Sequence, residues 1–419
     1  MGRLLPFTNL LPAEFWMPGS DVRFHGTIVD FAHRAGFILK GELPIGPDGF
    51  VARVHCLTAE GKQLTFLDSA PSGTHQDLGV KTTNWAQYVS LRILEGCIDA
   101  TVTFDSLQLR DVPFGAWYWN DFFNQAVHAT RLSSGEVEHF ASIPESLAES
   151  AEVVSGSVAA DVQFRTVASV SKSETGIAYR LNTHLTFKFA KPAATRAVVE
   201  LLHELKAFSH FLFATDELGG EIFVRSSTGT DIEVHDQVLP VSDMVDGPYD
   251  LKPILLRTAG ASLPAMLRNW IQRSDDIYDA VKYLLEGITG TPSTDISLGV
   301  QSLEGLHRRW TGVKELTLKA RLNQLAQMLP ATVRRRVLTQ NHGPYINRLV
   351  ETRDYVSHGK GIHKALRFSE DEERHAASCV IEFVRALVLL KLDVPPAAVE
   401  ALFAQRQTLF RYFLPEDYK

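Results

Sequence analysis

Cysteine is scarce in this chain. Its 419 residues include only Cys56, Cys97 and Cys379, which are scattered and odd in number. This spacing fits neither a disulfide framework nor a zinc site, and it favours a reducing compartment such as the cytoplasm. No clustered set of His, Asp and Glu residues is apparent in the sequence either, so we expect neither a metal nor another cofactor.

Long hydrophobic runs are also missing. The best is Ala386 to Leu390, which is flanked by Arg385 and Lys391, whereas a bilayer span needs roughly 18 residues. Residues 1–7 contain no long apolar stretch with a small-residue cleavage site, so we expect neither a signal peptide nor a membrane segment. Internal repeats, coiled-coil heptads and low-complexity segments are likewise not found.

Charge is distributed unevenly along the chain. Residues 1–259 carry 20 Lys+Arg against 31 Asp+Glu, and residues 260–419 carry 22 against 18. The first part therefore has a net charge of −11 and the second of +4, which sum to the −7 of the whole chain. Such a shift is typical of a domain boundary, and it places any polyanionic partner with the second part. Ordinary surface charge is the alternative explanation for so small an excess.

Period-two patterns predict a β-rich region over residues 1–250. Apolar residues from Leu181 to Phe189 alternate with polar ones, as in a half-buried strand. Similar runs predict strands near 35–43, 50–57, 63–67, 88–94, 100–109 and 221–224. Turn-forming residues separate them, which favours a sandwich-like fold. One helix is predicted from Ala193 to Phe213, and the Ser-, Ala- and Glu-rich stretch 147–157 is a candidate division between two β subdomains.

Helical spacing dominates residues 260–419. It predicts helices near 264–273, 276–287, 296–310, 312–329, 330–340, 344–357, 369–392 and 396–412. Ser369 and Glu372 form a capping box at the start of one of them. We therefore expect an α+β multidomain protein in which an all-α helical bundle follows the β-rich region.

The predicted helix 344–357 carries the most informative polar residues. Ile346, Leu349 and Val356 form an apolar stripe from which Arg353 projects. His358 comes five residues after Arg353, about 140° around a regular helix, and a glycine follows it as a C-terminal cap. The two side chains can meet only if the helix has ended by His358, or if a second copy of the helix supplies the partner.

The sequence from Arg353 to His358, Arg-Asp-Tyr-Val-Ser-His, resembles the active-site motif of HEPN-superfamily ribonucleases. That motif has Arg, a polar residue, three further residues and His at the end of a late helix. The layout of the chain is also similar to that of ApeA-type antiphage proteins, in which a β-rich N-terminal domain precedes a HEPN domain. Residues 37–43, Trp85 and the strands up to Trp119 look like the first domain of that family. Asp354 departs from the asparagine that is commoner after the arginine.

The resemblance implies a metal-independent endoribonuclease that cuts tRNA or another structured RNA in antiphage defence by abortive infection. It further implies a homodimer formed through the HEPN domain and a phage-derived trigger. His358 suits proton transfer near neutral pH, and the fork-shaped cation of Arg353 suits phosphate oxygens. Asp354 could orient either of them, and Lys360 and Lys364 are candidates for guiding RNA.

Several alternatives stay open. Arg353 and Asp354 could be a structural ion pair beside a helix-terminal histidine. The helical region could be a catalytically silent HEPN module for dimerisation or RNA binding, or the β-rich region could bind a ligand with the helices as scaffold. The segment 302–304 looks like the early helix of the HEPN family, in which Glu304 is either a buried helix residue or a brace for the site.

Overall fold

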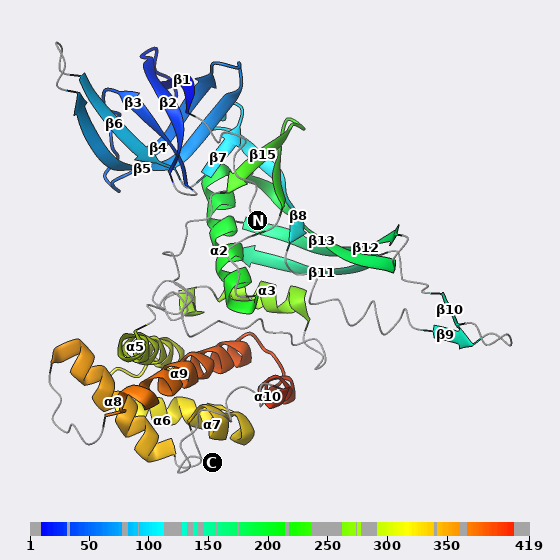
Figure 1. The fold of residues 1–419 in the computed structure, drawn as a ribbon, viewed down its shortest axis with the longest axis vertical. Helices are drawn as coiled ribbons and strands as arrows, with labels where there is room; N and C mark the ends of the chain where they lie inside the picture. Colours follow the sequence, from blue (N-terminus) through cyan, green and yellow to red (C-terminus); the bar gives the residue numbers. More distant parts are fainter. Residues whose placement is uncertain are drawn as a thin grey trace. The chain divides into compact units, whose positions relative to one another are not determined.

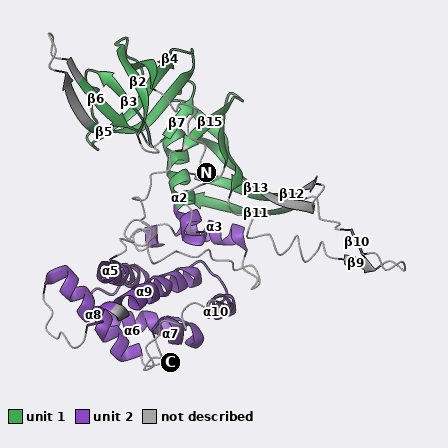
Figure 2. Ribbon diagram, viewed as in Figure 1, with its two compact units in different colours: residues 1–115, 125–206, 216–242 green, residues 116–124, 207–215, 243–419 purple. Residues whose placement is uncertain are grey.

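The chain forms two compact units (Figure 2). The computed structural model describes residues 10–31, 34–77, 83–90, 92–112, 128–131, 137–140, 146–155, 158–173, 176–213, 218, 220–236, 262–273, 275–277, 291–338, 342–359 and 367–405. The β-rich unit lies within residues 1–242, and the helical unit contains residues 243–419 together with 207–215. The elements are labelled along the chain in Figure 1.

The first strands of the β-rich unit close into a barrel. The strands are β1 (Leu11–Trp16), β2 (Phe24–Phe31), β3 (Arg34–Lys40), β4 (Val51–Thr58), β5 (Gln63–Asp77) and β6 (Thr83–Val89). Their order is β5-β4-β1-β2-β3-β6, and β6 pairs back onto β5. The long strand β5 makes closure possible because its residues from Gln63 to Ser69 pair with β4 and those from Ala70 to Asp77 pair with β6. The predicted sandwich is therefore wrong here.

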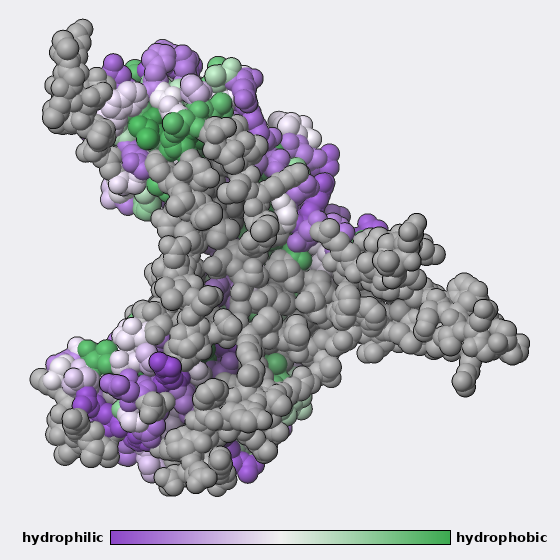
Figure 3. Space-filling view, in the orientation of Figure 1, coloured by the Kyte–Doolittle hydropathy of each residue, from purple (hydrophilic) through white to green (hydrophobic). Residues whose placement is uncertain are grey.

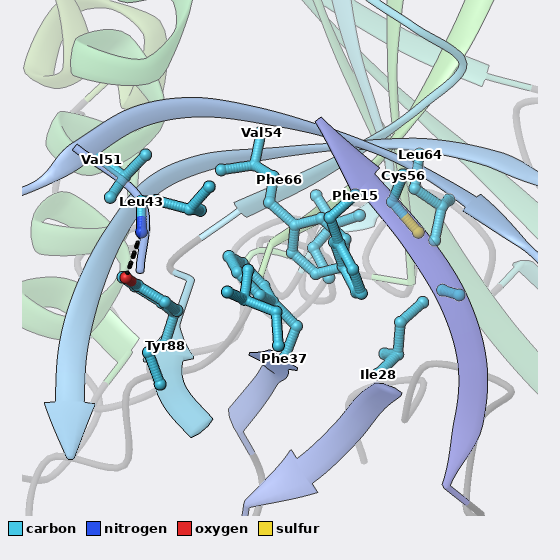
Figure 4. Packing of buried hydrophobic residues seen from close by; sticks show 14 residues of the cluster. Phe15, Ile28, Phe37, Leu43, Val51, Val54, Cys56, Leu64, Phe66 and Tyr88 are labelled. Carbon is cyan, nitrogen blue, oxygen red and sulfur yellow. Dashed lines mark hydrogen bonds between the residues drawn. The ribbon is translucent and has the colours of Figure 1, made fainter. Parts of the chain in front are cut away.

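Aromatic side chains fill the barrel (Figure 4). Phe37 lies between the rings of Phe15, at 4.8 Å, and Tyr88, at 5.1 Å. The Tyr88 hydroxyl accepts a 2.9 Å hydrogen bond from the Leu43 amide, which satisfies a polar group that is otherwise surrounded by apolar side chains. This end of the chain therefore has its own hydrophobic core.

An open antiparallel sheet continues the β-rich unit in the order β11-β12-β13-β8-β14-β15-β7. Its strands are β7 (Arg92–Glu95), β8 (Thr103–Val112), β11 (Ser146–Ser155), β12 (Val158–Ser173), β13 (Gly176–Ala194), β14 (Glu221–Ser226) and β15 (Asp231–Asp236). A separate hairpin pairs β9 (His128–Arg131) with β10 (Val137–Phe140).

Two sequence-based predictions for this region need correction. The stretch 147–157 does not divide the unit, because β11 pairs with β12 along its whole length. It is an edge strand whose described side chains are mostly exposed, which removes the apolar alternation by which strands are recognised. The predicted strand 88–94 is interrupted near Ser90 and belongs to β6 and β7. The predicted helix 193–213 is confirmed as α2 (Thr195–Phe213).

The helical unit contains seven labelled helices among its described residues. They are α3 (Leu263–Gln272), α5 (Pro292–Thr311), α6 (Leu318–Met328), α7 (Ala331–Val337), α8 (His342–His358), α9 (Glu370–Lys391) and α10 (Pro396–Gln405). The predicted helix starting at 312 begins six residues later. Gly312 adopts a left-handed conformation, and the buried Arg321 binds the carbonyl oxygens of Val313, Lys314 and Leu316 in the connection. Residues 278–290 and 406–419, which hold parts of two predicted helices, lie outside the described residues.

Helix α9 lies at the centre of this unit. Its residues from Ala376 to Leu389 are largely buried, and α5 packs against it at Gly299. The Glu372 carboxylate accepts hydrogen bonds from the amide and the hydroxyl of Ser369, both at 2.8 Å, at the predicted capping box.

The surface in the view of Figure 3 is mainly hydrophilic over the coloured residues of the helical unit. Within the described part of the chain, no helix combines the length and the apolar character needed to cross a membrane.

Candidate active site

Helix α8 buries one face and exposes its C-terminal end. Tyr345, Ile346, Leu349 and Thr352 are buried, at the three- and four-residue spacing of a helix that packs on neighbours. The helix packs against α5 and α6. The predicted stripe is confirmed for Ile346 and Leu349 but is wrong for Val356, whose side chain is 37% exposed. The apolar face therefore stops before the last turn, where the candidate catalytic residues lie.

Arg353 connects the residues of the motif. Its Nη1 donates to Asp354 Oδ1 at 2.8 Å and lies 3.3 Å from His358 Nε2. A guanidinium only donates hydrogen bonds, so Nε2 accepts and the neutral imidazole carries its hydrogen on Nδ1. The Arg353 side chain is only 19% exposed, whereas His358 is open to solvent. The structure thus brings Arg353, Asp354 and His358 together within one chain.

Arg353 and His358 meet although both residues belong to the helix. His358 is the last residue of α8, and Gly359 adopts φ 62° while its amide donates to the Tyr355 carbonyl at 2.9 Å. This is the glycine cap expected from the sequence. The two side chains therefore meet before the helix ends, contrary to the expectation from helical spacing, and a second copy of the helix is not needed to bring Arg353 to His358. The geometric reason for expecting a dimer is removed by this contact.

Helix α5 supplies a second layer of charged groups. Glu304 Oε2 lies 3.7 Å from Arg353 Nη2, and Glu304 Oε1 accepts from Arg308 Nη2 at 2.6 Å. The Glu304 side chain is 18% exposed, so its charge is partly shielded from water by the protein. Glu304 therefore lies where it can hold the Arg353 guanidinium. The negative charges of Glu304 and Asp354 balance the positive charges of Arg353 and Arg308.

A hydroxyl contact joins the same two helices. Ser297 of α5 is buried, and its Oγ lies 3.0 Å from Oγ of Ser357, the residue before His358. The contact fixes the last turn of α8 against α5. Sequence reasoning found neither Ser297 nor Arg308. Arg308 could have been noticed, because it follows Glu304 by four residues and such pairs meet on one helix face.

Some predicted residues cannot be placed. Lys360 and Lys364, the candidates for guiding RNA, lie outside the described residues, as does Trp119 in the β-rich region. The described part of the site therefore consists of the motif residues, Glu304, Arg308 and the serine pair.

One group in the β-rich unit has the residue types that bind metals. Glu95 of β7 and Glu233 and His235 of β15 offer ligand atoms within 4.8 Å of one another. The sequence does not reveal this group because two neighbouring strands supply it. The Lys62 ammonium forms an ion pair with Glu95, and burial lowers the pKa of His235 against the raising influence of Glu233 and Glu95. These contacts describe an ion-pair cluster on the sheet, and none of its residues belongs to the site on α8.

Comparison with known proteins identifies no family for this chain. No protein-family model matches it, and no curated protein matches it. A solved structure of the K. pneumonia MrkH–c-di-GMP complex matches with 12% sequence identity, over 46% of this chain and 87% of that one, at a TM-score of 0.16. A likeness at that TM-score supports no conclusion about fold or function, so any functional conclusion depends on the residues themselves.

Proposed function

We propose that the helical unit is a HEPN-type ribonuclease domain and that the protein is a metal-independent endoribonuclease. The observation that carries the proposal is the contact of Arg353 with His358, which puts a permanent cation beside a solvent-open imidazole at a helix end. An imidazole can serve as the base and the acid of RNA phosphodiester cleavage, and a guanidinium supplies positive charge for the phosphate oxygens. The assignment to the HEPN superfamily rests on the motif resemblance. We further propose that the protein acts in the cytoplasm, in antiphage defence, and that its substrate is tRNA or another structured RNA.

The proposed reaction uses the nucleophile that RNA itself carries. His358 Nε2 takes the proton from a ribose 2′-hydroxyl, and the 2′-oxygen attacks the adjacent phosphorus. The bond from phosphorus to the 5′-oxygen breaks, and that oxygen receives a proton from the imidazolium. The products are a 2′,3′-cyclic phosphate and a 5′-hydroxyl. Nε2 is the correct atom for the first step because it is the ring nitrogen without hydrogen in the neutral state.

Arg353 stabilises the charge that develops on the phosphorane oxygens. Its Nη1 is shared between Asp354 and His358, so an incoming phosphate competes with the imidazole for this donor. When the phosphate takes it, the imidazole is released to accept a proton. Asp354 and Glu304 hold the guanidinium on two sides and limit its rotamers. A homodimer belongs to the proposal on the resemblance alone, and so does a phage-derived trigger.

The test is cleavage of total tRNA by the purified full chain in the presence of EDTA. We expect cleavage to persist, to give 2′,3′-cyclic phosphate ends, and to be abolished by His358→Ala. His342→Ala is the matched control because it removes a histidine from the opposite end of the same helix. Cleavage that stops in EDTA and returns with magnesium contradicts the metal-independent mechanism. Cleavage at the parental rate by a folded His358→Ala variant contradicts the site.

The alternative of a silent HEPN module makes a different prediction. RNA retention without cleavage, unchanged by His358→Ala, would identify a binding module. No RNA binding at all would favour a ligand-sensing role for the β-rich unit.

A further inference from the structure

An exposed aromatic side chain lies beside the candidate catalytic histidine. Tyr355 is 46% exposed, in a helix whose other large apolar side chains are mostly buried. It precedes His358 by three residues, and side chains at that spacing are neighbours on a helix surface. Tyr355 and His358 therefore share one exposed face at the end of α8.

A second arginine covers one face of the Tyr355 ring. The Arg367 guanidinium carbon lies 3.8 Å from the ring centroid, which is a close cation–π contact. Arg367 comes from the segment that leads into α9. One face of the ring is thereby occupied by a planar cation, and the exposed fraction of the side chain leaves room for a second planar group.

The position of Arg367 is fixed by its neighbours. Phe368, the next residue, is buried and packs edge-on against Tyr345 of α8 at 5.2 Å. Arg348 donates to the Arg367 carbonyl at 3.1 Å and lies over the Phe368 ring at 4.3 Å. Because its backbone is held in this way, the arginine loses little freedom when a ligand binds.

We propose that Tyr355 and Arg367 form a base-stacking subsite for a single-stranded RNA segment next to the scissile phosphate. A nucleobase stacks on the open part of the Tyr355 ring, and the Arg367 charge attracts the adjacent phosphate. Bases in a duplex are stacked on one another and are closed to such a platform. The inference rests on the proposed ribonuclease function and narrows its substrate to loops, bulges or ends of a structured RNA.

The test measures binding separately from cleavage. The full chain with His358→Ala is titrated into a fluorescein-labelled single-stranded RNA and into the same RNA as a duplex. We expect tighter binding to the single strand. Adding Tyr355→Leu should weaken that binding by about tenfold or more, the size expected for one stacked base. Tyr355→Phe should retain it because the ring is kept.

A matched control separates stacking from general damage to the helix. Val356→Ala changes the next residue, which is also exposed but has no ring, and it should leave the affinity unchanged. Equal affinity of the Tyr355→Leu and parent proteins for single-stranded RNA overturns the subsite, even if the parent cleaves RNA. A parent protein that binds single strands through Tyr355 but never cuts them retains the subsite and contradicts the ribonuclease instead. Absence of any RNA binding contradicts both.

Discussion

Gly299 allows α5 to approach α9 closely, and replacing it should weaken the helical unit. A Cβ at this position would lie 2.2 Å from Cγ1 of Val380, far inside van der Waals contact. Val380 has little freedom to move because a β-branched side chain in a helix has essentially one rotamer. The two helices must therefore separate in Gly299→Ala.

The expected change in the free energy of unfolding is the sum of two opposing contributions. Overpacking a core costs about 3 kcal/mol at the upper end of the usual range. Replacing a mid-helix glycine by alanine gains about 1 kcal/mol. We therefore expect Gly299→Ala to lose about 2 kcal/mol, which lowers Tm by about 4–8 °C for a unit of this size. Movement of α5 should also displace Glu304 from Arg353 and reduce RNA cleavage.

Gly305→Ala is the matched control in the same helix. A Cβ at Gly305 meets nothing within 4 Å, so only the helix-propensity gain remains, and this variant should be about 0.5–1 kcal/mol more stable than the parent. Urea denaturation monitored by intrinsic tryptophan fluorescence measures the free energy of unfolding of the parent, the Gly299→Ala variant and the Gly305→Ala variant. Combining Gly299→Ala with Val380→Ala should cost less than the sum of the single changes. A Gly299→Ala protein as stable as the Gly305→Ala protein would refute the packing argument.

Three further predictions concern other parts of the fold. Hydrogen bonding by Arg348 lowers the pKa of Glu372 to about 2, so this ion pair stabilises the fold above the unfolded pKa of about 4.3 and its contribution is lost as the pH falls toward 2. Allowing for partial exposure of the pair, Arg348→Gln should lower the free energy of unfolding by about 1–2 kcal/mol at neutral pH and by much less near pH 2. If urea titrations show the same loss of stability at both pH values, the ion pair is not its cause. Gly359→Ala should cost about 1–2 kcal/mol because of its positive φ, and Gly359→Asn should cost less; equal Tm values for the two variants would contradict this. Gly26→Ala should disrupt the barrel, since its Cβ would lie 2.2 Å from the Ile38 carbonyl oxygen; an unchanged thermal unfolding curve would show that the strands can adjust.

Local patterns predicted the helices well because each helix shows its buried face in the sequence. Leu349 and Ile346 follow that rule, whereas Val356 obeys the spacing but is exposed, and it is the next residue, Ser357, that contacts α5. The late start of α6 could not be predicted, because it depends on Arg321 binding the carbonyls of the connection. Barrel closure depends on the length of β5, which pairs first with β4 and then with β6, and a period-two pattern does not reveal these partners.

The candidate site was predictable only in part. Arg353, Asp354 and His358 are close in sequence, so a motif resemblance suffices to select them. Arg308 and Ser297 come from another helix, and their role depends on how α5 packs against α8. The contact between Arg353 and His358 could not be settled from helical spacing, because it depends on the side-chain rotamers and not only on the angle between the two positions.

The central claim is that Arg353 and His358 act together on an RNA phosphodiester. The most direct measurement is the 2′,3′-cyclic phosphate released from total tRNA by the purified full chain in EDTA, compared with its His358→Ala and His342→Ala variants. We predict product from the parent and from His342→Ala, and none from His358→Ala. Equal product from all three proteins would contradict the assignment, and no product from the parent would contradict the proposed reaction.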